Sequence, residues 1–300
     1  MLQKFNEKNR DLIININGDL LHRKDAGISP FDSAVQGGDA VWEGLRVYNG
    51  KIFRLNAHLD RLRHSAIALD FKQIPSNEMI VTEIKRTLEA NQMQDNAHIR
   101  LTLTRGVKIT SGMDPRLNTN GPTLIVLAEH KEPVYDKSGL KLITASVRRP
   151  SPDILDPKIH HCNLIQSILA KIEATYAGAD DAIMLDQRGF VAETNATHLF
   201  IIKDNLIVTS RLIACPEGIT RDVVLRLCRQ NEINHEIRDY SLPEAYRADE
   251  MFCSGTMGEL APVTEVDGRT IGTGKIGPMT KLLTKLFNEC VNSESEQVLD

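Results

Sequence analysis

The sequence predicts an α+β fold with two domains, on three grounds. Its 300 residues exceed the usual size of one small domain and leave ample length for a buried core. Strand-like and helix-like runs mix without the strict alternation of a βαβ chain. A polar stretch with proline and glycine, residues 131–139, separates the two halves. We therefore expect a small N-terminal α/β domain at residues 1–130, a linker at 131–139 and a large C-terminal domain at 140–300.

The N-terminal half is expected to contain strands joined by turns, and two helices. An apolar run at residues 12–17 ends at a glycine turn, and Asn49-Gly50 between two apolar runs predicts a hairpin. Apolar residues with helical spacing predict a helix at residues 57–69, and good cap residues precede a second helix at about 78–90. Further strands are predicted at residues 98–104 and 123–128.

The C-terminal half is expected to contain a second set of strands with three helices. One helix begins shortly after Lys158. A second, at about residues 221–229, places Val223, Val224 and Leu227 on one apolar face. The third is predicted at about residues 279–291. Strands are predicted at residues 140–147, 181–185, 199–202 and 250–253 and around Ile237.

Composition argues against several classes of function. The net charge of −4 and the lack of a lysine or arginine run argue against nucleic-acid binding. No stretch approaches the length of a membrane-spanning apolar segment, and residues 1–10 lack the features of a secretory signal, so we expect a cytoplasmic protein with no membrane contact. Five scattered cysteines without a C-x-x-C pair indicate free thiols, with no disulfide framework and no metal site.

Lys158, just ahead of an apolar helix, is the first candidate for chemistry. A lysine in a loop is most often only an exposed charge, so the rest of the chain must support a catalytic role. Residues 218–220 begin a helix, where unpaired N–H groups favour a phosphate, although Thr220 could be only an N-cap. Residues 254–256 follow a strand and offer further donors, or form an ordinary glycine turn. Glu193 is either solvated or buried beside a cationic partner.

A lysine, an anion-binding helix start, a hydroxyl-bearing turn and a buried carboxylate are together what pyridoxal phosphate requires. The lysine forms a Schiff base, the helix start holds the phosphate, and the carboxylate keeps the pyridine nitrogen protonated. Composition and spacing alone leave this as one hypothesis among several.

A series of motifs, in order along the chain, carries a resemblance to a known family. The motifs are residues 41–46 (VWEGLR), 58–62 (HLDRL) with Ser65, Lys158 ahead of 168–170 (ILA) and 173–174 (EA), Glu193 with Phe200, 218–221 (GITR), 254–256 (SGT) with Glu259 and Pro262, and 267–268 (DG) followed by 277–278 (GP). Through them the chain resembles the class IV (fold type IV) pyridoxal-phosphate aminotransferases over nearly its whole length. It resembles the branched-chain amino acid aminotransferase-like branch most closely.

The resemblance implies a role for each matched residue. Lys158 corresponds to the Schiff-base lysine, and Glu193 corresponds to the partner of the pyridine nitrogen. The residues that correspond to the phosphate cradle are Arg61, Ile219, Thr220 and Thr256. The resemblance also implies two domains with the cofactor between them, and a homodimer in which the partner subunit completes the substrate pocket.

Departures from the branched-chain pattern bear on the substrate. The positions that differ from the usual residues are Gly37 and Asn163 (tyrosine), Trp42 (phenylalanine), Thr197 (glutamate) and His198 (asparagine). Residues 100–106 instead resemble the Thr-Arg-Gly strand end of D-amino acid transaminases and aminodeoxychorismate lyases. An arginine fork suits a carboxylate, although strand-end arginines are more often surface charges. The predicted substrate contacts are Trp42, Arg46, Arg100, Arg105 and Met257.

We therefore predict a transaminase that acts through a Lys158 aldimine. It is expected to move an amino group between an amino acid, with branched-chain L-amino acids favoured, and a 2-oxo acid such as 2-oxoglutarate. The alternatives are a D-amino acid transaminase, a lyase of the aminodeoxychorismate type, and a pyridoxal-phosphate-binding protein without turnover. The sequence leaves open the role of residues 160–162, which follow the lysine.

Overall fold

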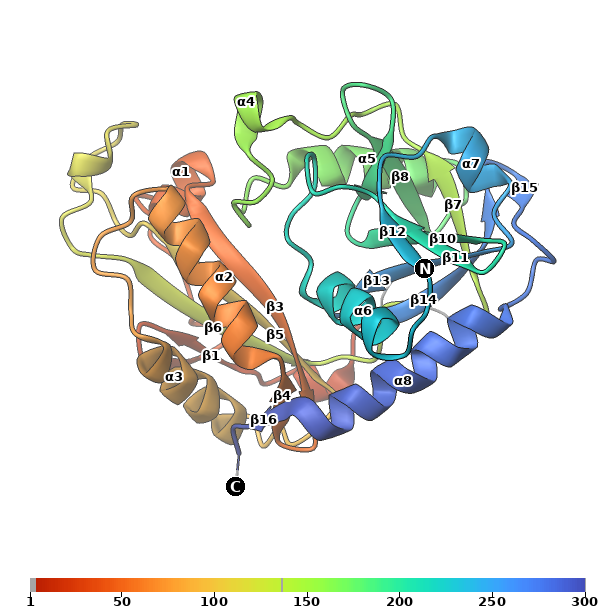
Figure 1. Cartoon of the computed structure of the whole chain (residues 1–300). Coiled ribbons are helices and arrows are strands. Elements are labelled where there is room, and N and C mark those ends of the chain that lie inside the picture. The colour runs from red at the N-terminus through yellow and green to blue at the C-terminus, as the bar shows by residue number, and fades with distance from the viewer. Residues whose placement is uncertain (1–3, 136, 300) are drawn as a thin grey trace. The chain divides into compact units, whose positions relative to one another are not determined.

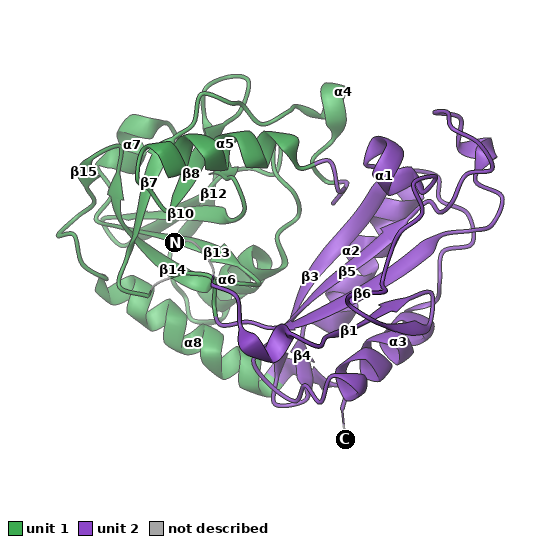
Figure 2. Cartoon of the chain, turned by 180° about the vertical axis from the view of Figure 1, so that it is seen from behind, with its two compact units in different colours: residues 1, 133–158, 164–293 green, residues 2–132, 159–163, 294–300 purple. Residues whose placement is uncertain are grey.

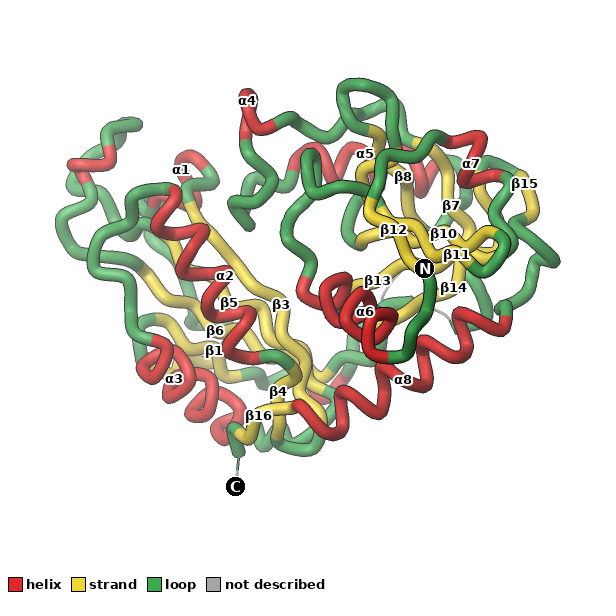
Figure 3. Tube along the Cα trace, in the orientation of Figure 1, coloured by secondary structure: helices red, strands yellow, loops and turns green. Residues whose placement is uncertain are grey.

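The computed structural model describes residues 4–135 and 137–299, which form two compact units (Figures 1 and 2). The N-terminal unit contains the described residues up to Glu132, together with residues 159–163 and 294–299. The C-terminal unit contains the described residues between 133 and 158 and residues 164–293. Both units combine helices with a sheet (Figure 3), so the α+β prediction is confirmed.

The N-terminal unit contains an antiparallel sheet in the order β16-β4-β3-β5-β6-β1-β2. Helix α2 packs on β3, and α3 packs on β6 and β1 (Figure 1). The alternation predicted for β5 is confirmed, because Ile99, Leu101 and Leu103 are fully buried in the core. The elements of this unit are η1 Glu7–Asn9, β1 Ile13–Ile16, β2 Asp19–His22, α1 Ser33–Gly37, β3 Ala40–Tyr48, β4 Lys51–Phe53, α2 Leu55–Ala68, α3 Asn77–Ala90, β5 Ala97–Thr104, η2 Pro115–Leu117, β6 Thr123–His130 and β16 Ser295–Gln297.

The hairpin predicted from Asn49-Gly50 is present between β3 and β4. Tyr48 pairs with Lys51, so the loop has two residues. Asn49 and Gly50 have φ angles of 48° and 74°, in the left-handed region that a two-residue hairpin of this type requires. Asparagine and glycine tolerate that region best, which explains why the sequence signal was reliable.

The C-terminal unit contains a mixed sheet in the order β12-β11-β10-β13-β14-β7-β8-β9, with β15 beside β14. Strand pairs β11–β12, β14–β7 and β7–β8 are parallel, and the other pairs are antiparallel. Helix α5 packs on β8, and α6 packs on β13. The elements of this unit are β7 Leu140–Thr144, α4 Pro152–Leu155, α5 Ile165–Tyr176, β8 Asp181–Leu185, β9 Val191–Thr194, β10 His198–Lys203, β11 Leu206–Thr209, α6 Ile219–Gln230, β12 His235–Ile237, α7 Leu242–Tyr246, β13 Glu250–Gly255, β14 Glu259–Val266, β15 Arg269–Thr270 and α8 Pro278–Glu294.

Two short segments group differently from the predicted division at residues 131–139. The chain passes from one unit to the other after Glu132, inside the predicted linker. However, residues 159–163 and 294–299 belong to the N-terminal unit, although both lie within the range 140–300 predicted as the C-terminal domain. Strand β16 pairs with β4 at the edge of the N-terminal sheet. Its three polar residues carry no apolar alternation, so periodicity could not detect this pairing.

The described residues also bear on the general expectations. Among the helices of residues 4–135 and 137–299, none combines the length and apolar character needed to cross a membrane. In the same residues, no three His, Cys, Asp or Glu side chains come together as metal ligands could. All five cysteines are free thiols, and Cys228 is buried on the apolar face of α6, together with Val223, Val224 and Leu227.

Candidate active site

Lys158 lies in the connection between α4 and α5 of the C-terminal unit. Its neighbour Pro157 is buried, and its own backbone N–H donates to Asp156 Oδ1 at 3.0 Å, which fixes the backbone in a tight turn. The Lys158 side chain is exposed, and across the described residues its amine has no hydrogen-bond or ion-pair partner. The amine is therefore accessible to a carbonyl compound.

The segment directly after the lysine, residues 159–163, is held by β3 of the N-terminal unit. The Trp42 backbone N–H donates to His160 O at 3.0 Å, and the Cys162 N–H donates to Ala40 O at 2.8 Å. The Trp42 indole N–H also donates to His161 O at 3.0 Å, and the ring of His160 stacks on the indole with centroids 4.4 Å apart. The loop whose role the sequence left open is thus a short strand-like addition to β3.

Glu193 is buried on β9, and its charge has a partner. Arg149 Nη2 lies 2.8 Å from Glu193 Oε1, and the two side chains are 13% and 3% exposed. The same guanidinium donates to Thr194 O at 3.2 Å and to Ser167 Oγ at 3.3 Å. A buried carboxylate needs such a counter-charge, and the structure supplies it from an arginine that none of the sequence motifs includes.

The pKa of the buried Cys215 thiol, in the loop that leads into α6, is shifted by burial and by nearby charges. Burial raises the pKa of Cys215 to about 12, the charge of Glu193 adds to this increase, and the charges of Arg221 and Arg149 oppose it. The thiol therefore stays protonated at neutral pH.

Helix α6 begins without a side-chain cap. Its N-cap is Gly218, so Thr220 is the second helical residue and the alternative that Thr220 serves only as the N-cap is wrong. A Cβ atom on Gly218 would lie 2.2 Å from His198 Cδ2 and 2.3 Å from His198 Nε2, so only glycine fits. A helix start of this kind, with its first N–H groups uncapped by a side chain, is suited to an anion.

The turn after β13 lies at the same end of the sheet as the start of α6. Ser254 pairs with His198 across β13 and β10, and the His198 ring also contacts Gly218. Ser254 Oγ is buried and has no hydrogen-bond partner among the described residues. A Cβ atom on Gly255 would lie 2.9 Å from Thr197 Cγ2, so this turn is also built on a required glycine. The two predicted anion-binding turns are thus brought together around His198.

The predicted phosphate ligand Arg61 lies on α2 of the N-terminal unit, where it forms a forked pair with buried Glu43. Arg61 Nε and Nη2 donate to the two carboxylate oxygens at 2.8 and 2.7 Å, and His58 Nδ1 lies 2.6 Å from Oε2. Burial would raise the pKa of Glu43, but the charges and hydrogen bonds of Arg61 and His160 hold it well below its ordinary value. The role of Arg61 as a phosphate ligand stays a prediction.

Three of the predicted substrate residues, Trp42, Arg46 and Arg100, lie with His98 on one face of β3 and β5. Arg46 pairs with His98 across the two strands, and the Arg100 guanidinium lies 3.4 Å from the centroid of the Trp42 ring. Within the described residues, Nε and Nη1 of Arg46 and both ring nitrogens of His98 are buried without hydrogen-bond partners. Burial, together with the charges of Lys131, Arg100 and Arg46, lowers the pKa of His98 to about 3. This face therefore holds fixed positive charge and suits a carboxylate.

Arg105 differs from these two arginines because protein acceptors occupy its guanidinium. It donates to both oxygens of Asp39 at 2.6 and 3.1 Å, to Leu69 O at 2.7 Å and to Asp70 O at 3.3 Å. This geometry gives Arg105 a structural role that holds the end of β5, and disfavours its predicted role as a carboxylate ligand. Met257, the last predicted contact, is half-buried in the turn after β13, and its carbonyl accepts a hydrogen bond from Val134.

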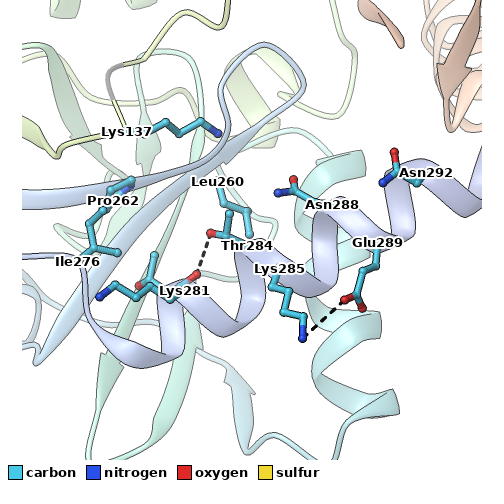
Figure 4. A pocket seen from close by; sticks show the side chains of 11 residues that line it. Lys137, Leu260, Pro262, Ile276, Lys281, Thr284, Lys285, Asn288, Glu289 and Asn292 are labelled. Atoms are coloured by element: carbon cyan, nitrogen blue, oxygen red, sulfur yellow. Dashed lines mark hydrogen bonds and ion pairs between the residues drawn. The ribbon is translucent and has the colours of Figure 1, made fainter. Parts of the chain in front are cut away.

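A pocket of about 430 Å³ between β14 and α8 offers an alternative set of lysines (Figure 4). Lys137 pairs with Glu259 at 2.7 Å, and Lys285 lies 3.9 Å from Glu289. Leu260 and Pro262 form part of the wall of the pocket. No uncapped helix start and no buried carboxylate are among the residues that line it, so this pocket lacks the parts of an anion-bearing cofactor site.

Two residues of the site, Arg149 and His198, were not predicted from the sequence, and a third, Ser254, was predicted only as part of a turn. Arg149 stands in the run Arg148-Arg149-Pro150, in the connection between β7 and α4, and only its distance to Glu193 shows its role. His198 stands where the branched-chain pattern has an asparagine, and its contact with Gly218 joins two residues that are distant in the chain. The sequence predicts donors from the turn that contains Ser254, and the fold shows that the Ser254 hydroxyl is buried without a hydrogen-bond partner among the described residues.

Comparisons with known proteins place the chain in a family. A family model described as Amino-transferase class IV matches residues 40–266. The chain is 52% identical over 283 residues to branched-chain-amino-acid aminotransferase-like protein 2 of Arabidopsis thaliana, covering 94% of this chain and 51% of that protein. It is 34% identical to a branched-chain-amino-acid aminotransferase of Pseudomonas aeruginosa, covering 96% of this chain and 95% of that one. It is 31% identical to a D-alanine aminotransferase of Bacillus licheniformis, covering 94% and 98%.

A solved structure has the same fold. The T.th. branched-chain amino acid aminotransferase, complexed with N-(5'-phosphopyridoxyl)-L-glutamate, superposes with a TM-score of 0.89 at 31% identity, covering 96% of this chain and 99% of that one. The fold type predicted from the sequence is therefore confirmed. The chain spans about half the length of the Arabidopsis relative that it matches.

Proposed function

Because the chain belongs to the class IV aminotransferases, we propose that it is a pyridoxal-phosphate-dependent transaminase. The observation that carries this proposal is the set of groups gathered in the C-terminal unit. An uncapped helix start, a buried Ser254 hydroxyl without a partner among the described residues, a buried Glu193 paired with Arg149, and an accessible amine at Lys158 all lie in one compact unit.

These groups fit the cofactor part by part. The glycine-capped start of α6, with Ile219 and Thr220, and the turn at Thr256 would hold the phosphate. Glu193 would hold a proton on the pyridine nitrogen, since a buried carboxylate with an arginine beside it stays ionised. Lys158 would bind the aldehyde of the cofactor through its amine.

When bound, pyridoxal phosphate supplies an electron sink that makes the α-proton of an amino acid labile. Lys158, once released from the aldehyde, is the residue proposed to remove and return that proton at the substrate α-carbon. The side chains of Arg46 and Arg100 on the N-terminal unit are proposed to bind a substrate carboxylate, because their face holds positive charge and, in the part of the chain that the structure describes, Arg46 donors without partners.

The amino donor is proposed to be a branched-chain L-amino acid and the acceptor a 2-oxo acid such as 2-oxoglutarate. The names of the Pseudomonas relative and of the solved structure support this choice. A D-amino acid transaminase is the second candidate, which the Bacillus relative supports. The Thr-Arg-Gly strand end gives this second candidate less support than the sequence suggested, because Arg105 is already bound to Asp39. We further propose a homodimer, which sedimentation equilibrium would test.

Reductive trapping tests the cofactor assignment. The chain is mixed with pyridoxal phosphate, reduced with borohydride and digested, and the labelled peptide is identified by mass. We expect the label on Lys158 and none in Lys158→Ala, while Lys281→Ala, a change in the pocket of Figure 4, keeps it. A label on Lys281, or no label at all, would contradict the proposal.

Half-reactions then separate the candidate activities. Amino transfer from L-leucine to 2-oxoglutarate is the expected result, and transfer from D-alanine alone would favour the second candidate. Release of pyruvate without an amino acceptor would identify a lyase. A visible absorbance band without any half-reaction would identify a binding protein.

A further inference from the structure

We propose that Arg149 is a positioning residue that keeps Glu193 ionised and oriented, so that Glu193 can hold a proton on the ring nitrogen of the cofactor. This inference rests on the proposed function. It concerns an ion pair of the C-terminal unit that neither the sequence motifs nor the family resemblance selected.

Hydrogen bonds to residues other than Glu193 hold Arg149 in place. Its backbone N–H donates to Leu185 O at 2.9 Å, and its carbonyl accepts from Gln187 Nε2 at 2.9 Å. Its guanidinium is anchored on Ser167 of α5 and on the carbonyl of Thr194, next to Glu193 in the chain. Because these bonds already order the Arg149 side chain, its ion pair with Glu193 costs little further conformational entropy. This favours a persistent contact.

The ion pair between Arg149 and Glu193 is largely shielded from water, so water weakens their attraction little. Glu193 is 3% exposed and Arg149 is 13% exposed, with 2.8 Å between Nη2 and Oε1. A carboxylate buried alone would take up a proton, because burial disfavours the charged form. A neutral carboxylic acid cannot stabilise a protonated pyridine. The charge of Arg149 therefore favours the ionised form of Glu193 that its proposed role needs.

The C-terminal unit offers a matched control. Arg188 also pairs with a carboxylate, at 2.7 Å from Asp186 Oδ2, but its side chain is 47% exposed. Arg188→Gln removes the same charge from the same unit and touches none of the proposed site residues. Arg149→Gln removes the charge beside Glu193, and Arg149→Lys keeps a positive charge there.

The experiment measures whether the ring nitrogen of the bound cofactor is protonated. Each variant is loaded with pyridoxal phosphate labelled with ¹⁵N in the ring, and the ¹⁵N chemical shift reports whether that nitrogen carries a proton. We expect a protonated nitrogen in the parent protein, Arg188→Gln and Arg149→Lys, and an unprotonated one in Arg149→Gln. A protonated nitrogen in Arg149→Gln would overturn the proposal. An unprotonated nitrogen in Arg149→Lys would also overturn the proposal. The proposal can therefore still be tested if Arg149→Gln does not fold.

A cofactor analogue separates this role from general damage. In 1-deaza-pyridoxal phosphate, carbon replaces the ring nitrogen, so Glu193 has no proton to hold. We expect Arg149→Gln to slow the amino-acid half-reaction by about 10–100-fold with the natural cofactor, as loss of an orienting partner does elsewhere, and by less than about twofold with the analogue. Equal slowing with both would mean that Arg149 is only structural. If the parent protein binds no pyridoxal phosphate, or Glu193→Gln leaves the ¹⁵N shift unchanged, the proposed function itself fails.

Discussion

Replacing Gly218 by alanine places a methyl carbon where the ring of His198 already lies. The backbone allows alanine, because the φ angle of −71° is ordinary for any residue. The cost arises from overlap, since the new atom would lie 2.2 and 2.3 Å from two ring atoms of His198 and 3.1 Å from Arg221 Cβ. His198 is 5% exposed and pairs with Ser254, so the ring has little room to turn away.

The magnitude follows from overpacking. Adding a methyl group to a filled interior costs about 1–3 kcal/mol of stability. In a protein of this size each kcal/mol lowers the melting temperature by about 2–4 °C. The start of α6 must also move away from His198, which displaces the N–H groups of Ile219 and Thr220. We therefore expect weaker binding of pyridoxal phosphate, by about tenfold if one charge-assisted hydrogen bond is lost, with no change for pyridoxal, which lacks the phosphate.

Thermal melts and absorbance titrations with both forms of the cofactor measure these effects. Gly27→Ala is the matched control, because Gly27 has an ordinary φ angle and no atom lies within 4 Å of the position that its Cβ would take. The double variant Gly218→Ala with His198→Ala removes the overlap and should recover most of the lost stability. A melt of Gly218→Ala equal to that of the parent protein, or a double variant no more stable than the single one, would refute the reasoning.

Two further predictions concern the N-terminal unit. Glu43→Gln should lower stability at neutral pH by about 1–3 kcal/mol, because it removes the buried charge that accepts two hydrogen bonds from Arg61. Since the pKa of Glu43 is held well below its ordinary value of 4.5, the ionised carboxylate stabilises the fold above that pH and the stabilisation fades as the pH falls further. Urea melts at several pH values should show the difference shrinking in acid, and a constant difference would contradict this account. Arg105→Gln should lower stability while leaving the substrate KM within about twofold, whereas Arg100→Gln should raise KM; a large rise in KM for Arg105→Gln would restore it as a carboxylate ligand.

Local chemistry made part of this molecule predictable. The hairpin at Asn49-Gly50, the alternation of β5 and the apolar face of α6 each follow from a few neighbouring residues, and each is present. The order of the strands does not follow from neighbours. Strands β7 and β14 are parallel partners that lie far apart in the chain, and no local pattern encodes that pairing.

In the candidate site, too, some residues were predictable from local sequence and others were not. Residue type and position within a helix or turn made Lys158, Glu193 and Thr220 candidates, and the resemblance to the family supplied their predicted roles. The residues that act on them were not predictable, because Arg149 and His198 are defined by distance rather than by motif. Arg46 and Arg105 looked equivalent in sequence. Within residues 4–135 and 137–299, however, two buried donors of Arg46 have no hydrogen-bond partner, whereas Arg105 donates to both oxygens of Asp39.

The pairing of β16 with β4 sets a limit on when the N-terminal unit can be completed during synthesis. Glu296 accepts a hydrogen bond from the backbone N–H of Asn56 at 3.0 Å, a contact that spans 240 residues. While the ribosome is still adding the C-terminal unit, β4 is an edge strand with unpaired N–H and C=O groups, a state that favours pairing with other chains. Closing so long a loop is also slow relative to local folding. The nascent chain therefore carries an open sheet edge until residues 295–297 have emerged, and that interval is when it most needs protection from aggregation.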